Sequence, residues 1–332
     1  MRIGIITPAP PRSRYGNRVT AVRWARILRK LGHRVTIAQE YDGKRYDLLV
    51  ALHARKSHDA VSQFHQQHPD SPIIVALTGT DLYRDLHSKP KTATSLDLAT
   101  RVVALQPKAL DQLEPALREK AVVIYQSVET RRSIHPSPHF SFAMRDGRPR
   151  HFDVCVIGHL RPVKDPFRAA MAARLLPASS RIRILHIGGA MTKAMARRAR
   201  TETKRNKRYR WLGEQPRWRV RRILSRSQLT VLSSRTEGGA NVLSESLVAS
   251  VPVLASRIPG NEGVLREDYP GYFAVSDTRG LARLLNRAEN DAAFHAYLST
   301  RGRKLARLFD PAREEEAWAN LLNEVAQAKG ET

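Results

Sequence analysis

The sequence is poor in cysteine and in long apolar runs. Its single cysteine, Cys155, excludes a disulfide within one chain of 332 residues. Because Cys155 lies in the apolar run Val154–Ile157, we expect a buried small side chain. No apolar run approaches the roughly 18 residues that a transmembrane helix needs, so we expect no membrane-spanning segment.

The start of the chain also lacks a targeting signal. The residues MRIGIITPAPPRSRYG contain no long apolar segment and no small-residue cleavage site, and they predict a first strand. A hydrophobic content of 42% allows folded cores, and the length suits about two domains. We therefore expect a cytoplasmic protein without stable membrane insertion.

Acidic residues are scarce relative to basic ones. The chain has 57 Lys and Arg against 31 Asp and Glu, a net charge of +26. Thirteen basic residues fall between Lys193 and Arg222, with only two acids among them. Such a block suits either nucleic acid or the solvated face of helices in an Arg-rich protein. Because no zinc-ligand spacing or RNA-binding aromatic motif accompanies it, we favour the solvated face and expect no nucleic-acid partner.

Short apolar segments alternate with amphipathic ones along the chain. This rhythm predicts a parallel sheet covered by helices. It lapses at about residues 130–150, where proline, serine and histidine predict an irregular connection, and then restarts. Predicted strands are 2–7, 33–40, 48–52, 73–77, 102–105, 122–125, 152–157, 182–187, 209–212, 229–232 and 251–255; predicted helices include 18–31, 59–68, 107–117 and 311–328.

A glycine loop separates two acids in the stretch TEGGANVLSE, residues 236–245. Paired glycines are unfavourable inside a helix, so the stretch predicts a loop followed by a helix that starts near Ala240. Upstream, GHLRPVKDP (158–166) and WLGE (211–214) each follow a predicted strand, and VPVLA (251–255) lies downstream. Because the carboxyl ends of parallel strands face one crevice, we expect these loops to lie together.

This order of motifs resembles the nucleotide-sugar half of the GT4-like family of GT-B glycosyltransferases, over roughly residues 152–270. The resemblance implies an α/β chain with the GT-B fold, in which two Rossmann-like parallel-sheet domains face a central cleft. The domains would be an acceptor-binding domain at 1–145, a nucleotide-sugar-binding domain at 146–310, and a last helix at 311–332 that crosses back to the first domain.

The residue types suit a nucleoside diphosphate sugar. Arg161 and Lys164 can neutralise the diphosphate, and amides near the helix start form an anion site. Glu237 would accept hydrogen bonds from the sugar, and Glu245 from the ribose; the alternative is that both acids are surface charges beside a turn. The expected donor-binding residues are Gly158, Arg161, Lys164, Gly213, Glu237, Gly238, Gly239, Ala240, Asn241, Val242 and Glu245.

The first half places basic and hydroxyl side chains after its predicted strands. GNRVTAVRW (16–24), LHARKS (52–57) and TGTDLY (78–83) follow strand ends and suit a small anion. The alternatives are a solvated loop for Arg55 and Lys56 and a helix cap for Asn17. The expected acceptor-binding residues are Asn17, Arg18, Thr20, Arg55, Lys56, Thr78, Gly79 and Thr80.

Taken together, GNRVTAVRWA, LHARKS, TGTDLY and GHLRPVKDP resemble the bacterial selenosugar synthase family of selenoneine biosynthesis, over about residues 1–325. The resemblance implies that selenophosphate and UDP-N-acetylglucosamine are the substrates. It also implies a functional link to a selenophosphate synthetase and to a downstream selenoneine synthase. The UDP-sugar is a substrate, so no cofactor is expected.

The expected catalytic residues are Arg161, Lys164, Glu237 and His53. Selenophosphate needs little general-base help, so the protein would mainly position two anions and stabilise the departing diphosphate. His53, Asp81 or His159 would assist loss of the phosphoryl group, or each is a structural loop residue. The donor site carries no Asp-X-Asp motif, and we expect no metal. Two alternatives stay open: a GT4-type enzyme that acts on a hydroxyl acceptor in a lipid or polysaccharide, and, more remotely, a nucleic-acid-binding protein.

Overall fold

The computed structural model describes residues 1–129, 144–145, 148–149 and 151–330, and its contacts divide the chain into two units. The first comprises Met1–Ser127, Glu237–Asn241 and Leu308–Thr332. The second comprises Val128–Thr236 and Val242–Arg307. Most of the irregular connection expected at 130–150 lies outside the described residues, and the expected boundaries after residues 145 and 310 stay predictions.

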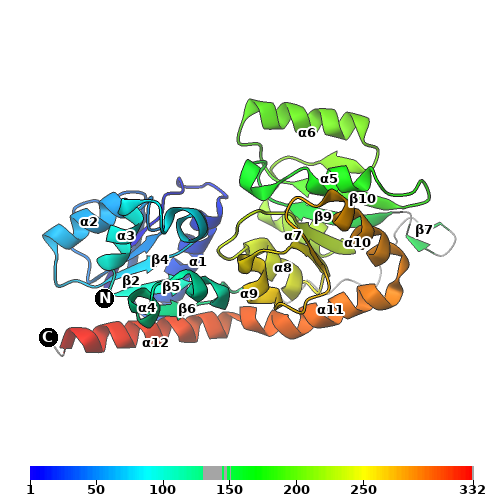
Figure 1. Ribbon diagram of the computed structural model, residues 1–332. Coiled ribbons are helices and arrows are strands. Elements are labelled where there is room, and N and C mark those ends of the chain that lie inside the picture. Colours follow the sequence, from blue (N-terminus) through cyan, green and yellow to red (C-terminus); the bar gives the residue numbers. More distant parts are fainter. Residues whose placement is uncertain (130–143, 146–147, 150, 331–332) are drawn as a thin grey trace. The chain divides into compact units, whose positions relative to one another are not determined.

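The first unit is built on a parallel six-stranded sheet in the order β2-β1-β3-β4-β5-β6 (Figure 1). Its central strands read as continuous apolar runs because both faces of the sheet are covered. The elements are β1 (Arg2–Ile6), α1 (Gly16–Lys30), β2 (Arg34–Ala38), β3 (Leu48–Leu52), α2 (His58–Gln67), β4 (Ile73–Ala76), η1 (Asp81–Asp85), α3 (Pro90–Asp97), β5 (Arg101–Ala104), η2 (Pro107–Gln112), α4 (Pro115–Glu119), β6 (Ala121–Val123) and α12 (Pro311–Gly330).

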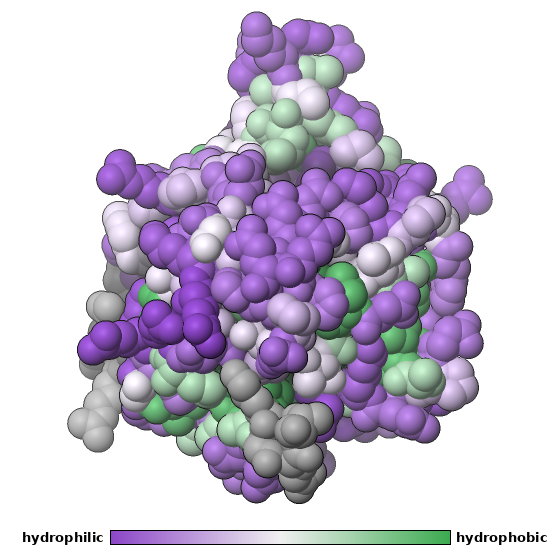
Figure 2. All heavy atoms as spheres, turned by 90° about the vertical axis from the view of Figure 1, so that its left-hand side faces the viewer, coloured by the Kyte–Doolittle hydropathy of each residue, from purple (hydrophilic) through white to green (hydrophobic). Residues whose placement is uncertain are grey.

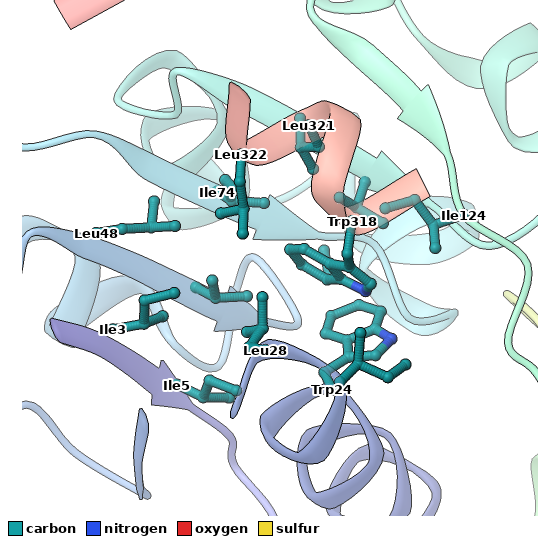
Figure 3. Packing of buried hydrophobic residues seen from close by; sticks show 14 of the residues in the cluster. Ile3, Ile5, Trp24, Leu28, Leu48, Ile74, Ile124, Trp318, Leu321 and Leu322 are labelled. Carbon is teal, nitrogen blue, oxygen red and sulfur yellow. The ribbon is translucent and has the colours of Figure 1, made fainter. Parts of the chain in front are cut away.

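The core on one face of this sheet joins α1 to α12. Trp24 and Trp318 are fully buried, and their rings meet edge-on with centroids 4.8 Å apart. Figure 3 shows the two rings against strand residues such as Ile5 and Ile74. The last helix, which was predicted at 311–328, contributes Trp318, Leu321, Leu322 and Val325 to this core. Val22, also in α1, is half exposed.

The second unit has a second parallel six-stranded sheet, in the order β11-β10-β9-β12-β13-β14. Cys155 in β9 is completely buried, as expected. The elements are β7 (Met144–Arg145), β8 (Arg148–Pro149), β9 (Phe152–Ile157), η3 (Pro162–Lys164), α5 (Arg168–Ala173), β10 (Ile182–Ile187), α6 (Lys193–Arg205), β11 (Tyr209–Trp211), α7 (Arg217–Leu224), β12 (Leu229–Leu232), α8 (Asn241–Val248), β13 (Val253–Ser256), α9 (Pro259–Leu265), β14 (Tyr272–Phe273), α10 (Thr278–Asn290), α11 (Ala292–Ala306) and η4 (Arg307–Phe309).

The strand orders identify where each sheet can bind a ligand. Each order reverses direction once, between β1 and β3 in the first sheet and between β9 and β12 in the second. In open α/β sheets, ligands bind outside the carboxyl ends of the strands at such a reversal. The loops that follow these strands are therefore the places to examine in each unit.

The basic segment 193–222 lies largely on the surface. Of the residues in α6, only Ala199 is buried, and Thr192 caps the helix by accepting a hydrogen bond from the Met195 amide. Figure 2 shows one face of the molecule, where hydrophilic side chains predominate.

No helix within the described ranges has both the length and the apolar character needed to cross a bilayer.

Candidate active site

A buried carboxylate joins two loops at the carboxyl edge of the first sheet. Asp81 is fully buried and accepts hydrogen bonds from the amides of Thr78 (3.0 Å) and Gly79 (2.7 Å), in its own loop after β4. It also accepts one from the amide of Ala54 (3.1 Å), in the loop after β3. Three amide donors compensate much of the cost of burying one carboxylate, so Asp81 fixes the relative position of the two loops.

His53 lies in the first of these loops and faces the second. Its Nε2 is 3.0 Å from Oγ1 of Thr80, and its Nδ1 is 3.8 Å from Oδ2 of Asp81. Burial lowers the pKa of the imidazole, and the Asp81 carboxylate partly opposes that shift. The ring is therefore a neutral donor or acceptor near neutral pH. Its backbone φ of +75° is unusual for a residue with a side chain, which marks a strained position of the kind common at functional sites.

The Arg55 guanidinium forms an ion pair with a buried carboxylate. Its Nε lies 2.7 Å from Oδ2 of the buried Asp85, which is also 3.4 Å from Nε of Arg84. The alternatives expected for Arg55 were an anion-binding role and a solvated loop. The structure shows a third arrangement, because one carboxylate is shared between two guanidinium groups. Lys56, the neighbouring basic residue, is exposed.

The first turn of α1 carries three more of the expected acceptor residues. Thr20 is buried, and its Oγ1 accepts a 2.7 Å hydrogen bond from Nε2 of Gln126. Arg18, two residues earlier, is partly exposed. Asn17 is not the helix cap that the sequence analysis offered as an alternative, because the N-cap position is Tyr15 and Asn17 lies inside the helix.

The glycine loop Glu237–Asn241 belongs by its contacts to the first unit. A Cβ atom on Gly238 would lie 2.5 Å from the Thr78 carbonyl carbon, and one on Gly239 would lie 2.7 Å from Cβ of Leu105. Both approaches are too close for any residue with a side chain, which explains the paired glycines. At the end of the loop, the Asn241 side chain accepts a 3.2 Å hydrogen bond from Arg23 Nη1.

In the second unit, the loop after β9 is tied to the segment after β12. Ser233 Oγ donates to the carbonyl oxygens of Lys164 (3.1 Å) and Asp165 (2.9 Å), and the Arg235 amide donates to the carbonyl of Val163 (2.8 Å). These bonds set the backbone that carries Lys164 and the exposed Arg161. The two basic residues expected to bind diphosphate therefore stand at the strand-order reversal of this sheet.

Two further residues expected at the donor site lie in the same unit. Gly213 follows β11 with a φ of +69°, and its carbonyl accepts a 2.9 Å hydrogen bond from the Gly188 amide. Glu245 lies in α8, about one turn after Asn241, with its carboxylate 3.8 Å from Nη2 of Arg217. Glu237 falls in the first unit, whereas Arg161, Lys164 and Glu245 fall in the second, so their convergence on one ligand stays a prediction.

Several buried polar residues near these loops were not predicted from the sequence. Arg23, Asp85 and Glu314 are buried within the first unit, and His186 supports the Gly158 carbonyl in the second. Each stands in an apolar or charged run with no local sign of its partner. Among the described residues, no group of three or more His, Cys, Asp or Glu side chains could hold a metal ion.

This chain is similar to one family model and to several solved structures. Residues 147–305 match the family model described as Glycosyl transferases group 1. Sucrose-phosphate synthase from Thermosynechococcus elongatus aligns with a TM-score of 0.79 at 15% identity, over 99% of this chain and 100% of that one. HepE from Anabaena, solved with UDP and glucose, aligns with a TM-score of 0.75 at 16% identity, over 98% and 100%.

A glycosyltransferase from Rickettsia africae aligns with a TM-score of 0.72 at 12% identity, over 98% of each chain. At these identities the likeness shows the fold. The two parallel six-stranded sheets form a GT-B architecture, and the similarity to the glycosyl transferases group 1 model covers residues 147–305.

Proposed function

We propose that this chain transfers the sugar of UDP-N-acetylglucosamine to selenophosphate and so forms a 1-selenosugar and UDP. The group 1 domain supports a nucleotide-sugar donor. The similar HepE structures contain UDP and UDP-glucose, which favours uridine diphosphate as the leaving group. The main support for the acceptor assignment is that Asp81 joins two loops. This connection places the His53 ring beside the Thr80 hydroxyl.

This part of the first unit suits a small tetrahedral oxyanion. It offers short hydroxyl groups at Thr78 and Thr80, and the Asp81 carboxylate is already surrounded by three amide donors. The Arg55, Arg84 and Asp85 side chains together keep a net positive charge. Further positive potential comes from Lys56 in the same loop as Arg55, and from Arg18 and the N-terminus of α1 after the neighbouring strand β1. A bulky acceptor would not need so many short polar groups.

The reaction joins selenium to the anomeric carbon. A lone pair on the selenium atom of selenophosphate attacks C1 of the sugar, the C1–Se bond forms, and the bond from C1 to the diphosphate oxygen breaks. Water then cleaves the Se–P bond, which leaves phosphate and the selenosugar. In this scheme Arg161 and Lys164 stabilise the leaving diphosphate, together with the amides of Gly238–Val242.

The two acids of the glycine loop and α8 take different roles in this scheme. Glu237 accepts hydrogen bonds from the transferred sugar, and Glu245 from the ribose. Glu245 must then exchange its 3.8 Å contact with Arg217 for the ribose hydroxyls, or Arg217 must move with it. The structure leaves Glu245 only partly buried, so a ligand has access to the carboxylate.

The test is incubation of the protein with UDP-N-acetylglucosamine and selenophosphate, followed by mass spectrometry. We expect a sugar product with the selenium isotope pattern and release of equimolar UDP. Thiophosphate should react as a slower analogue, and inorganic phosphate should bind but react poorly, because oxygen is the weaker nucleophile. Failure of selenophosphate to react, with turnover of a lipid or sugar hydroxyl, would overturn the proposal.

One observation favours the alternative hydroxyl acceptor. A hydroxyl needs a general base, and His53 with Asp81 at 3.8 Å resembles an imidazole oriented by a carboxylate. The three amide bonds to Asp81 instead indicate a structural carboxylate. His53→Asn separates the two functions: it should reduce transfer to a hydroxyl by about a hundredfold or more, whereas attack by selenophosphate should be much less affected.

A further inference from the structure

A buried arginine links the last helix of the chain to the glycine loop. Arg23 lies in α1 beside Trp24, and both side chains are buried, with only 8% of the Arg23 side chain exposed. A guanidinium in such a place must be paired and hydrogen-bonded to offset its lost hydration. The identity of its partners therefore indicates what the residue does.

The first partner is an acid on α12. Arg23 Nε lies 3.3 Å from Oε1 of Glu314, whose side chain is fully buried. The same carboxylate accepts hydrogen bonds from Trp24 Nε1 at 2.8 Å and from the Ser127 amide at 2.8 Å, and it also contacts the Ser127 hydroxyl. Four donors hold Glu314 in one orientation, so it presents a fixed oxygen to the guanidinium.

The other partners lie on the far side of the guanidinium. Nη1 donates to the Ser127 carbonyl and to Oδ1 of Asn241, each at 3.2 Å. Asn241 ends the glycine loop and is the first residue of α8. The loop is thus held at two places: Gly238 packs directly on Thr78 and Gly79, and Asn241 is held by Arg23.

A buried ion pair adds little net stability compared with apolar side chains of similar size, so stability alone does not account for two charges here. The planar guanidinium of Arg23 instead fixes the orientation of its partners, because it donates to three acceptors at once, which a lysine ammonium could not do in this geometry. We propose that Arg23, oriented by Glu314, is a positioning residue for the transferase: it fixes Asn241 and hence the backbone amides at the start of α8. The inference rests on the proposed function, in which those amides bind the diphosphate.

Arg23→Gln tests the proposal, with Lys30→Gln as a matched control. Lys30 pairs with Glu315 at 2.6 Å and joins the same two helices, but at the exposed surface. We expect Arg23→Gln to lower kcat at least tenfold and to weaken UDP binding by about three- to tenfold. Hydrogen exchange in peptides covering residues 237–248 should also accelerate. Lys30→Gln should leave all three measurements within twofold of wild type.

A double-mutant cycle with Asn241→Ala distinguishes positioning from a general loss of structure. If Arg23 acts through Asn241, the effects of the two substitutions on UDP affinity and on kcat should be strongly non-additive. Additive effects, or a folded Arg23→Gln enzyme with wild-type kinetics and exchange, would overturn the proposal. If Arg23→Gln does not fold, Glu314→Gln keeps the shape of the partner and is judged by the same measurements.

The binding and exchange measurements do not depend on the acceptor. A wild-type enzyme that ignores selenophosphate would contradict the proposed function alone. Unchanged UDP affinity and unchanged exchange in the variants would contradict the role of Arg23 alone.

Discussion

The indole nitrogen of Trp24 donates a 2.8 Å hydrogen bond to Oε1 of Glu314, 290 residues further along the chain. The ring of Trp24 also meets Trp318 one helical turn later. One residue of α1 therefore contacts α12 through both a polar and an apolar group. The last helix is part of the core of the first unit.

Removing Trp318 should destabilise that unit strongly. Trp318→Ala deletes a fully buried ring, and the cavity adds to the lost transfer free energy, so we expect the free energy of unfolding to fall by about 3–5 kcal/mol. Urea denaturation measures it. Trp218→Ala is the control, because that side chain is 64% exposed and its loss should change the value by no more than about 0.5 kcal/mol. Equal effects of the two substitutions would contradict this packing.

The stability of the second unit should depend on pH through His186. Its Nε2 lies 3.1 Å from the Gly158 carbonyl and its Nδ1 3.0 Å from the Tyr209 hydroxyl, an arrangement that suits a neutral ring with its proton on Nε2. Burial lowers the pKa of His186 from 6.5 to about 4. Between these values the unfolded state binds the proton and the folded state does not.

The stabilising contribution is therefore complete above pH 6.5 and is lost as the pH falls toward 4, by up to about 3 kcal/mol. Denaturation at pH 7.5 and at pH 5 should show the loss in the wild type and a smaller one in His186→Gln. The same loss in both proteins would mean that other groups cause it.

Cys155 should be chemically silent in the native protein. Burial raises the pKa of its thiol to about 12, so the thiol stays protonated at neutral pH. A reagent also cannot reach the buried sulfur. A thiol reagent should label the chain only after urea is added, at a rate set by opening of the second unit. Rapid labelling without denaturant would show that β9 is not buried as described.

Arg161 and Lys164 should contribute to UDP binding. Replacing either by alanine removes a charged hydrogen-bond donor, so we expect the binding free energy of UDP to become less favourable by about 1.5–3 kcal/mol. Calorimetry with UDP measures the change. The exposed Arg303→Ala in α11 serves as a control, because it removes the same charge at a residue whose side chain donates to Ser299 and Thr300 of its own helix. Wild-type affinity in both the Arg161 and the Lys164 variants would remove them from the donor site.

Arg18 should affect the acceptor and not the donor. Arg18→Ala should raise the KM for selenophosphate or abolish turnover while UDP affinity is kept, since Arg18 lies in the first unit, whereas Arg161 and Lys164, the bases proposed to bind the diphosphate, lie in the second. Steady-state kinetics with each substrate varied in turn will separate the two effects. Unchanged selenophosphate kinetics would exclude Arg18 from the acceptor site.

The sequence by itself determined the architecture. Central strands of a parallel sheet are buried on both faces, so β3 is a continuous apolar run and β9, β10 and β12 are mostly apolar segments, all at the predicted positions. The start of α8 was also predictable, because paired glycines cannot continue a helix. The two-residue strand β14 and the short helices α3 and α5 were not predicted, since such short elements show no clear hydrophobic periodicity.

Only the tertiary structure decided how the polar residues are paired. Asp81 bridges two loops, Asp85 engages Arg55, and Arg23 meets a carboxylate 291 positions away. Hydrogen bonds between distant segments leave no local pattern in the sequence. The same reason explains why Glu237–Asn241, in the middle of the second half, groups with the first unit. Side-chain size at Gly238 is limited by the Thr78–Gly79 backbone, and at Gly239 by the Leu105 side chain, and no spacing rule encodes either contact.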